Sequence, residues 1–291
     1  MKNSQININI YLFKTLAKTY NEYIIFNQNY FGENKDFHRN EDFYTLIKNV
    51  MSELLKNKKA LLKNEDKILT ETAILCLNRN FGGLEKSSSI IKKIFKKKYE
   101  YKFDESVDIN MPYSIIDAIK NNILDSNSRN LLLISEGNTG CDIVKFILYL
   151  IGKKYVEIIG YKFKDLNIEI YGEKILNRIR NIMESNNILI LRDLDIIYPS
   201  LYNLFNQNFT YFRGKRFVKI AFAYSNKSIE VNKDFHCIVI VNKNQIDNCK
   251  IFPTFLNKFE KHIIDLRTLL EEKDNNIARK LSEYLNKNYF F

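Results

Sequence analysis

A short apolar run that leads into a glycine loop constrains the fold of this chain more than any other feature. Residues 131–145 read LLLISEGNTGCDIVK, in which 131–134 suit a buried strand, 137–142 a tight loop, and the next apolar residues a helix. This order is that of the phosphate-binding unit of P-loop proteins, where backbone N–H groups at the helix start hold phosphate. The segment therefore predicts a P-loop-like α/β fold.

The loop lacks the residues that phosphate chemistry requires. An active loop reads G-x-x-x-x-G-K-[ST], in which the lysine holds phosphate and the hydroxyl group binds Mg²⁺. If Gly137 is the first glycine, Asp142 stands at the second glycine position. Ile143 and Val144 then replace the lysine and the hydroxyl residue. We expect a module that keeps the architecture, does not hydrolyse nucleotide and holds no cofactor. Its candidate loop residues are Gly137, Asn138, Thr139 and Gly140.

Three residues stand where AAA+ ATPases, a class of P-loop proteins, keep catalytic groups. Asp193 follows the apolar run 188–191, the place of the acidic pair that holds Mg²⁺ and orients water, but Leu194 replaces the second acid. Asn242 follows a later apolar run, at the place of a polar sensor. Lys258 stands at the place of an arginine finger, although lysine lacks the planar guanidinium fork. Each also fits a structural role, such as a helix N-cap for Asp193, so we assign no catalytic residue.

Two alternatives belong to other functional classes. One is an active ATPase with a non-standard loop, in which Lys145 supplies the cation. Lys145 lies two residues beyond the required position, which corresponds to a rotation of about 200° on a helix. The other is a basic scaffold that binds nucleic acid, because the net charge is +11. The densest basic run, 92–98, carries no aromatic-studded RNA-binding signature, so we do not expect a nucleic-acid partner.

Composition bears on location and on metals. The four cysteines are scattered without a C-x-x-C pair, which indicates reduced thiols and no zinc or other metal site. No apolar run is long enough to span a bilayer. The N-terminus lacks the pattern of a signal peptide. We therefore expect a cytoplasmic protein.

Periodicity divides the chain into two regions. Apolar residues three and four apart indicate helices at 11–26, 42–55, 65–77 and 87–97. Beyond about residue 110 helices and strands alternate, which predicts a parallel sheet covered by helices on both faces. Strands are expected at 131–135, 155–159, 188–191, 217–223, 227–231, 237–241 and 263–266, and helices at 114–124, 142–150, 171–184, 199–208, 255–261 and 269–286.

Longer motifs carry a family resemblance. They are 36–48 (DFHRNEDFYTLIK), 78–83 (NRNFGG), 198–207 (YPSLYNLFNQ), 214–218 (GKRFV), 235–242 (FHCIVIVN) and 252–262 (FPTFLNKFEKH). Together they resemble the mysterin family of giant AAA+ RING-type E3 ubiquitin ligases, whose members carry arginine where this chain has Lys258.

The resemblance implies a domain plan and a set of partners. Residues 1–100 would be the helical lid of one AAA+ module, 101–266 the degenerate core of the next, and 267–291 the start of its lid. ATP and Mg²⁺ would bind in neighbouring modules of the same polypeptide, and the ubiquitin machinery would act through the full-length protein. Because family members are thousands of residues long and carry a zinc-binding RING, we expect this chain to be a fragment. Its role would be a structural, coupling segment of the motor ring.

Overall fold

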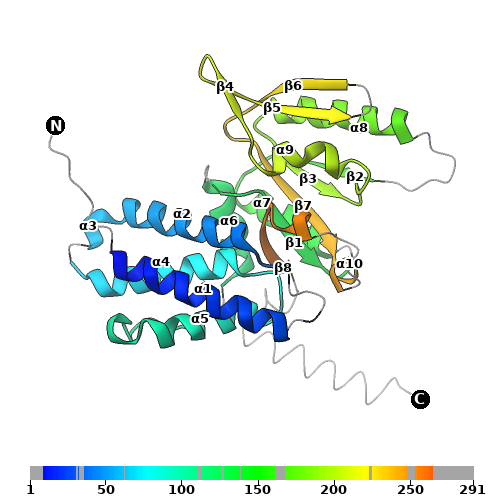
Figure 1. Cartoon of the computed structure of the whole chain (residues 1–291). Coiled ribbons are helices and arrows are strands. Elements are labelled where there is room, and N and C mark those ends of the chain that lie inside the picture. The colour runs from blue at the N-terminus through cyan, green and yellow to red at the C-terminus, as the bar shows by residue number, and fades with distance from the viewer. Residues whose placement is uncertain are drawn as a thin grey trace, which may run out of the picture.

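The N-terminal third of the chain is helical in the computed structural model (Figure 1). The structure describes residues 9–30, 32, 36–61, 63–110, 113–125, 128–137, 139–160, 168–222, 225–247 and 253–264. The helices of this region are α1 (Ile10–Tyr30), α2 (Asn40–Lys56), α3 (Lys58–Leu61), α4 (Glu65–Asn80) and α5 (Ser87–Lys98), followed by the 3-10 turn η2 (Glu100–Lys102). The four longer helices are those that the periodicity predicts. Their inward faces form one hydrophobic cluster around Leu16, Leu46 and Leu77, which are fully buried.

Helices and strands alternate in the rest of the chain. The helical elements are α6 (Ile115–Leu124), α7 (Thr139–Leu150), α8 (Ile168–Met183), η3 (Tyr198–Leu201), α9 (Tyr202–Phe205), α10 (Lys243–Asp247) and α11 (Pro253–Leu256). The strands are β1 (Leu131–Ser135), β2 (Tyr155–Ile159), β3 (Ile188–Arg192), β4 (Thr210–Phe212), β5 (Lys215–Phe222), β6 (Ser225–Val231), β7 (His236–Asn242) and β8 (Glu260–Ile264).

Five of these strands form a parallel sheet in the order β2-β3-β7-β1-β8. Helices cover both faces of the sheet, and alternate residues of each strand point to opposite faces. Leu131 and Leu133 pack with α6 and α7, whereas Leu132 belongs to the cluster on the α8 side. The predicted α/β fold with a helix-covered parallel sheet is therefore confirmed. The helical region lies beside the edge strand β8 and packs against it through α4 (Figure 1).

A second, smaller sheet is inserted between β3 and β7. Strands β4, β5 and β6 are antiparallel, and the turn that joins β4 to β5 projects from the body of the molecule (Figure 1). The sequence predicted strands at 217–223 and 227–231, which correspond to β5 and β6, but it did not predict the short strand β4. Its residues fall beyond the predicted helix 199–208, which in the structure ends at Phe205.

The end of the sheet differs most from the expectation. The predicted helix 255–261 is wrong after Leu256, because β8 already begins at Glu260. Glu260, Lys261 and His262 are charged or polar, yet each is more than 90% buried. Their partners come from the distant helical region, which periodicity cannot reveal. The predicted helix 269–286 lies outside the described residues.

Candidate functional site

The loop between β1 and α7 packs the start of its helix directly on the strand. A Cβ atom on Gly140 would lie only 2.4 Å from the Cβ of Ser135, so this position requires glycine. Gly137 has open space around it but a φ of 61°, so glycine there serves the backbone conformation. Ser135 and Gly140 are separated by four residues, the spacing of the two glycines in G-x-x-x-x-G. Cys141 and Asp142 follow Gly140 directly.

The two residues expected to replace the lysine and the hydroxyl lie elsewhere. Ile143 and Val144 are buried in the cluster that α6 and α7 form against the sheet, with 8% and 0% of their surface exposed. Helix α7 begins at Thr139, three residues before the expected start. The hydroxyl of Thr139 donates to the carbonyl of Glu136 at 2.8 Å and so closes the turn. Asn138 lies outside the described residues.

The carboxylate of Glu157, on β2, contacts three polar side chains near the start of α7. Glu157 accepts a hydrogen bond from the thiol of Cys141 at 2.9 Å. It also pairs with Lys145 at 2.7 Å and with Arg192 at 3.5 Å. Burial would raise the pKa of Glu157, but the hydrogen bonds from Cys141 and Lys145 and the two positive charges hold it below the usual value. Burial and the Glu157 contact raise the pKa of Cys141, which keeps the thiol protonated. We call these four residues the Glu157 cluster.

Strand alternation explains why Arg192 reaches this cluster. Ile188 and Ile190 pack on the α7 side of β3, so Arg192 has the same direction. The next residue, Asp193, is exposed and has a φ of 53°, a left-handed conformation. A Cβ on Gly160 would lie 1.9 Å from the carbonyl oxygen of Asp193, so the close approach of these two backbones requires glycine. The structure thus directs a guanidinium, and not the carboxylate of Asp193, toward the start of α7.

The two remaining candidates serve local structure. The side-chain oxygen of Asn242 accepts from the backbone N–H of Asn244 at 3.0 Å and caps α10. Lys258 donates to Asn206 at 2.8 Å and lies 4.6 Å from the ring centre of Tyr202, which fastens it to its own module. Of the predicted site residues, the loop glycines and Asn242 lie at the C-terminal ends of the neighbouring strands β1 and β7, because the strand register pairs Ser135 with Asn242. Lys258 lies apart from them.

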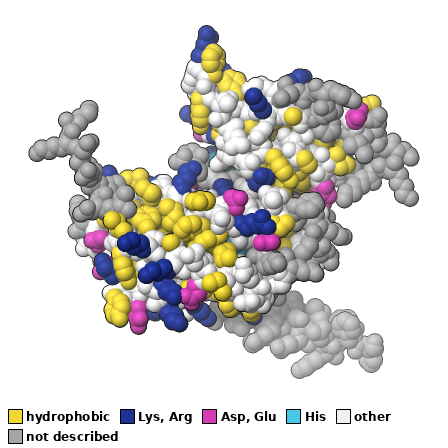
Figure 2. All heavy atoms as spheres, viewed as in Figure 1, with side chains coloured by type: hydrophobic (Ala, Val, Ile, Leu, Met, Phe, Trp, Pro, Cys, Tyr) yellow, Lys and Arg dark blue, Asp and Glu magenta, His cyan; other side chains and the backbone are white. Residues whose placement is uncertain are grey.

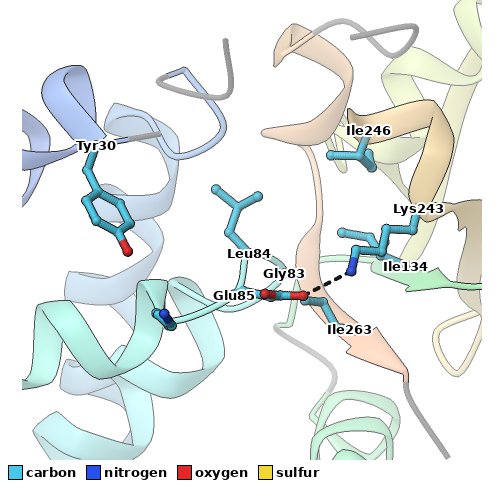
Figure 3. Close-up of a pocket in the computed structure, with 9 residues that line it drawn as sticks. Tyr30, Gly83, Leu84, Glu85, Ile134, Lys243, Ile246 and Ile263 are labelled. Atoms are coloured by element: carbon cyan, nitrogen blue, oxygen red, sulfur yellow. Dashed lines mark hydrogen bonds and ion pairs between the residues drawn. The ribbon is translucent and has the colours of Figure 1, made fainter. Parts of the chain in front are cut away.

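A cavity of about 360 Å³ opens at the C-terminal ends of the strands, between the helical region and the sheet (Figure 3). Its apolar floor comes from the ends of β1 and β8 and from α10, through Ile134, Ile263 and Ile246. Lys243 reaches across to Glu85 of the helical region at 2.9 Å and lies 3.7 Å from Glu136 of the loop. Lys243 therefore links the helical region to the loop after β1.

Buried ion pairs join the helical region to the sheet. Arg79 of α4 pairs with Glu260 of β8 at 3.0 Å, and both side chains are 3% exposed. Asp42 of α2 pairs with Lys261 of β8 and with Arg129, each at 2.9 Å. Buried pairs of this kind are strongly destabilised when one partner is removed. The helical region and the sheet are therefore held in one arrangement.

A buried histidine supports the same junction. His38 lies between the hydroxyl of Tyr23 at 2.8 Å and the carbonyl of Gly82 at 2.9 Å. A carbonyl can only accept, so Nε2 carries the proton and Nδ1 accepts from the tyrosine. Burial and the charge of Lys261 lower the pKa of His38 to about 3, and the ring is neutral.

Sequence reasoning missed Glu157 and Arg192. The signal for Arg192 was present, because alternation along 188–192 places it on the same side as Ile188 and Ile190. The sequence shows Glu157 only as an acid inside an apolar strand. This position does not reveal which residues Glu157 contacts. Within the described ranges no helix combines the length and apolar content that a membrane crossing needs. The same ranges contain no group of three His, Cys, Asp or Glu side chains suited to a metal ion.

Comparison with known proteins gives one family. The sequence model of the RNF213 AAA domain matches residues 120–270. The chain is 26% identical over 265 residues to the E3 ubiquitin-protein ligase RNF213 of Mus musculus, covering 87% of this chain and 5% of that protein. It is 27% identical over 271 residues to the RNF213 of Homo sapiens (88% and 5%) and 26% identical over 263 residues to rnf213-beta of Danio rerio (87% and 5%). The chain thus spans about 5% of the length of these relatives. RNF213 is also called mysterin, so the resemblance that the motifs carry is confirmed.

Proposed function

This chain belongs to the RNF213 AAA domain family, and from this premise we propose that it is a nucleotide-degenerate AAA+ module of an E3 ubiquitin ligase. Its role is structural: it completes the motor ring and transmits changes of shape between neighbouring modules of the same polypeptide. Those modules bind ATP and Mg²⁺, and the ubiquitin machinery acts through the full-length protein in the cytoplasm. The module itself holds no nucleotide.

The Glu157 cluster is the observation that carries the proposal. With Ser135 and Gly140 as the two glycine positions, Cys141 and Asp142 stand at the places of the lysine and the hydroxyl residue. This register begins two residues earlier than the one inferred from the sequence. Arg192, on the side of β3 that faces α7, then replaces the acid that binds Mg²⁺. A guanidinium cannot coordinate a metal ion, and that of Arg192 lies 3.5 Å from the carboxylate of Glu157.

The second cation near the loop is also engaged. Lys145 pairs with Glu157 at 2.7 Å, so an ATPase that used Lys145 would first have to break this pair. Both cations of the Glu157 cluster are therefore engaged by one carboxylate, which a phosphate group would have to displace. This arrangement supports an inert module more than the alternative of a non-standard active loop.

The buried junction supports the coupling role. Arg79–Glu260 and Asp42–Lys261 tie α4 and α2 to β8, the edge strand of the sheet. If residues 1–100 are the lid of the preceding module, a movement of that lid carries this core with it as one body. Residues 101–266 would then relay the movement to the lid that begins at 267.

Titration of the purified chain with Mg-ATP, followed by calorimetry, tests the inert assignment. We expect no binding by the wild type and measurable binding after the combined change Cys141→Lys, Asp142→Thr and Arg192→Asp. The matched control is Ile143→Lys with Val144→Thr, which places polar groups in the core and should lower stability without producing binding. Micromolar binding by the wild type that Lys145→Ala abolishes would contradict the proposal and support the active-loop alternative.

A further inference from the structure

The tip of the hairpin between β4 and β5 exposes aromatic and basic side chains together. Tyr211 and Phe212 are 74% and 63% exposed, although aromatic side chains of this size are usually at least partly buried. Arg213 lies beside them, with its guanidinium 5.1 Å from the ring centre of Phe212. Dark blue and yellow side chains gather over the projecting hairpin (Figure 2). The tip is the part of this sheet that lies farthest from the body of the molecule (Figure 1).

The backbone of the tip holds these side chains in place. Phe212 pairs with Lys215, so Arg213 and Gly214 form a two-residue turn. Their φ angles of 49° and 75° are both positive, as the tightest hairpin turns require. Glycine, asparagine or aspartate is the usual residue at the position of Arg213, and arginine there is strained. A strained backbone that presents a charged side chain at an exposed tip indicates a function for that side chain.

The two aromatic rings lie on opposite faces of the hairpin. Tyr211 pairs with Arg216, which has the same direction as the buried Val218 two residues on. Phe212, one residue after Tyr211, therefore faces the other way. On one side a hollow of about 540 Å³ is lined by Tyr211, Arg216 and Glu230, among others. A partner that uses both rings must contact both faces of the tip.

The charge of the inserted segment points to an acidic partner. Residues 209–235 contain six lysines and arginines and only two acids, Glu230 and Asp234. Lys215 already pairs with Glu230 at 2.8 Å. Arg216 donates to the carbonyls of Val231 and Asn232, and its charge is partly offset by the nearby Asp234. The positive charge at the tip is therefore only partly balanced from within the chain.

We propose that the β4–β5 tip is a docking element for an acidic segment of another polypeptide. Tyrosine and arginine are the residue types that most often carry the energy of protein interfaces. A single-stranded nucleic acid is the less suitable occupant, because successive bases stack on rings that share one face, and Tyr211 and Phe212 do not. The acidic segment would lie along the hairpin, with a carboxylate on Arg213 and contacts to Tyr211 in the hollow.

Fluorescence anisotropy with a labelled poly-glutamate peptide tests this proposal on the whole chain. The variants are Arg213→Gly, which keeps the turn and removes the charge, and Tyr211→Ser, which removes an exposed ring. Neither change touches the core, and circular dichroism checks the fold. We expect each variant to weaken binding by about tenfold at moderate salt, the scale of an interface hot spot.

A matched control separates this site from general attraction to a basic protein. Lys97→Ser removes one exposed charge from α5, far from the hairpin in sequence, and should leave the affinity unchanged. The proposal is overturned if poly-glutamate does not bind, or if the tip variants and the Lys97 variant bind equally well. It is also overturned if single-stranded oligothymidylate binds more tightly than poly-glutamate and loses its affinity in the tip variants.

Discussion

The guanidinium of Arg79 and the carboxylate of Glu260 form a two-pronged pair inside the protein, across 181 residues of sequence. The Nε and NH2 groups of Arg79 lie 3.3 and 3.0 Å from the two carboxylate oxygens. Asn122 donates to the same carboxylate at 3.0 Å, and His262 lies 3.1 Å from it. This planar pairing joins α4 to the edge strand β8 and orients the helical region on the sheet.

Loss of one partner should therefore be costly. Arg79→Met leaves the charge of Glu260 buried without its main partner, and we expect the free energy of unfolding to fall by about 3–5 kcal/mol. Urea denaturation measures this change. In the double variant Arg79→Met with Glu260→Gln the loss should be smaller than the sum of the two single losses. Additive losses would show that the two side chains do not stabilise each other.

Stability should fall as the pH falls below about 6.5. His38 is neutral in the folded protein, where its pKa is about 3, and has an ordinary value of 6.5 in the unfolded chain. Between these values the unfolded state binds more protons, so acid favours unfolding, with a slope of about 1.4 kcal/mol per pH unit from this residue. His236, whose pKa burial lowers to about 4, acts in the same direction. Denaturation at several pH values should show a shallower slope in His38→Gln, and an unchanged slope would refute the assignment.

Gly140→Ala should destabilise the fold through one contact. The new Cβ would meet the Cβ and Oγ of Ser135 at 2.4 and 2.5 Å, which predicts a loss of about 1–3 kcal/mol from overpacking. Adding Ser135→Gly should restore most of the melting temperature. Gly137→Ala provides the comparison, because its cost comes from the positive φ and Ser135→Gly should not relieve it. Equal behaviour of the two glycine variants would argue against the contact.

Glu157→Gln should weaken the region around the start of α7. The carboxylate is 16% exposed and pairs with both Lys145 and Arg192, so the amide leaves two neighbouring cations without this shared counter-charge. We expect a loss of about 1–3 kcal/mol in the free energy of unfolding, measured by chemical denaturation. The control is Glu230→Gln, which breaks a surface pair with Lys215 and should cost less than about 1 kcal/mol. A Glu157 variant as stable as this control would mean that the cluster does not hold the loop.

Several features of the fold were predictable because their signals are local. The 3.6-residue periodicity of α1 and α2 and the unbroken apolar runs of β1 and β3 follow from the side chains of each segment. The loop between β1 and α7 was predicted to be degenerate, since no register places a lysine after its second glycine. The register itself was not predictable, because it depends on how closely Gly140 approaches Ser135.

The sequence by itself determined the helix-covered parallel sheet and shows that no lysine directly follows the second glycine of the loop. Only the tertiary structure decided that Arg192 and Lys145 share the carboxylate of Glu157, and that Glu260 and Lys261 belong to a buried strand. The physical reason is the range of the interactions. Periodicity records which side of a segment is apolar, whereas the free energy of a buried charge depends on a partner that the fold brings from far along the chain.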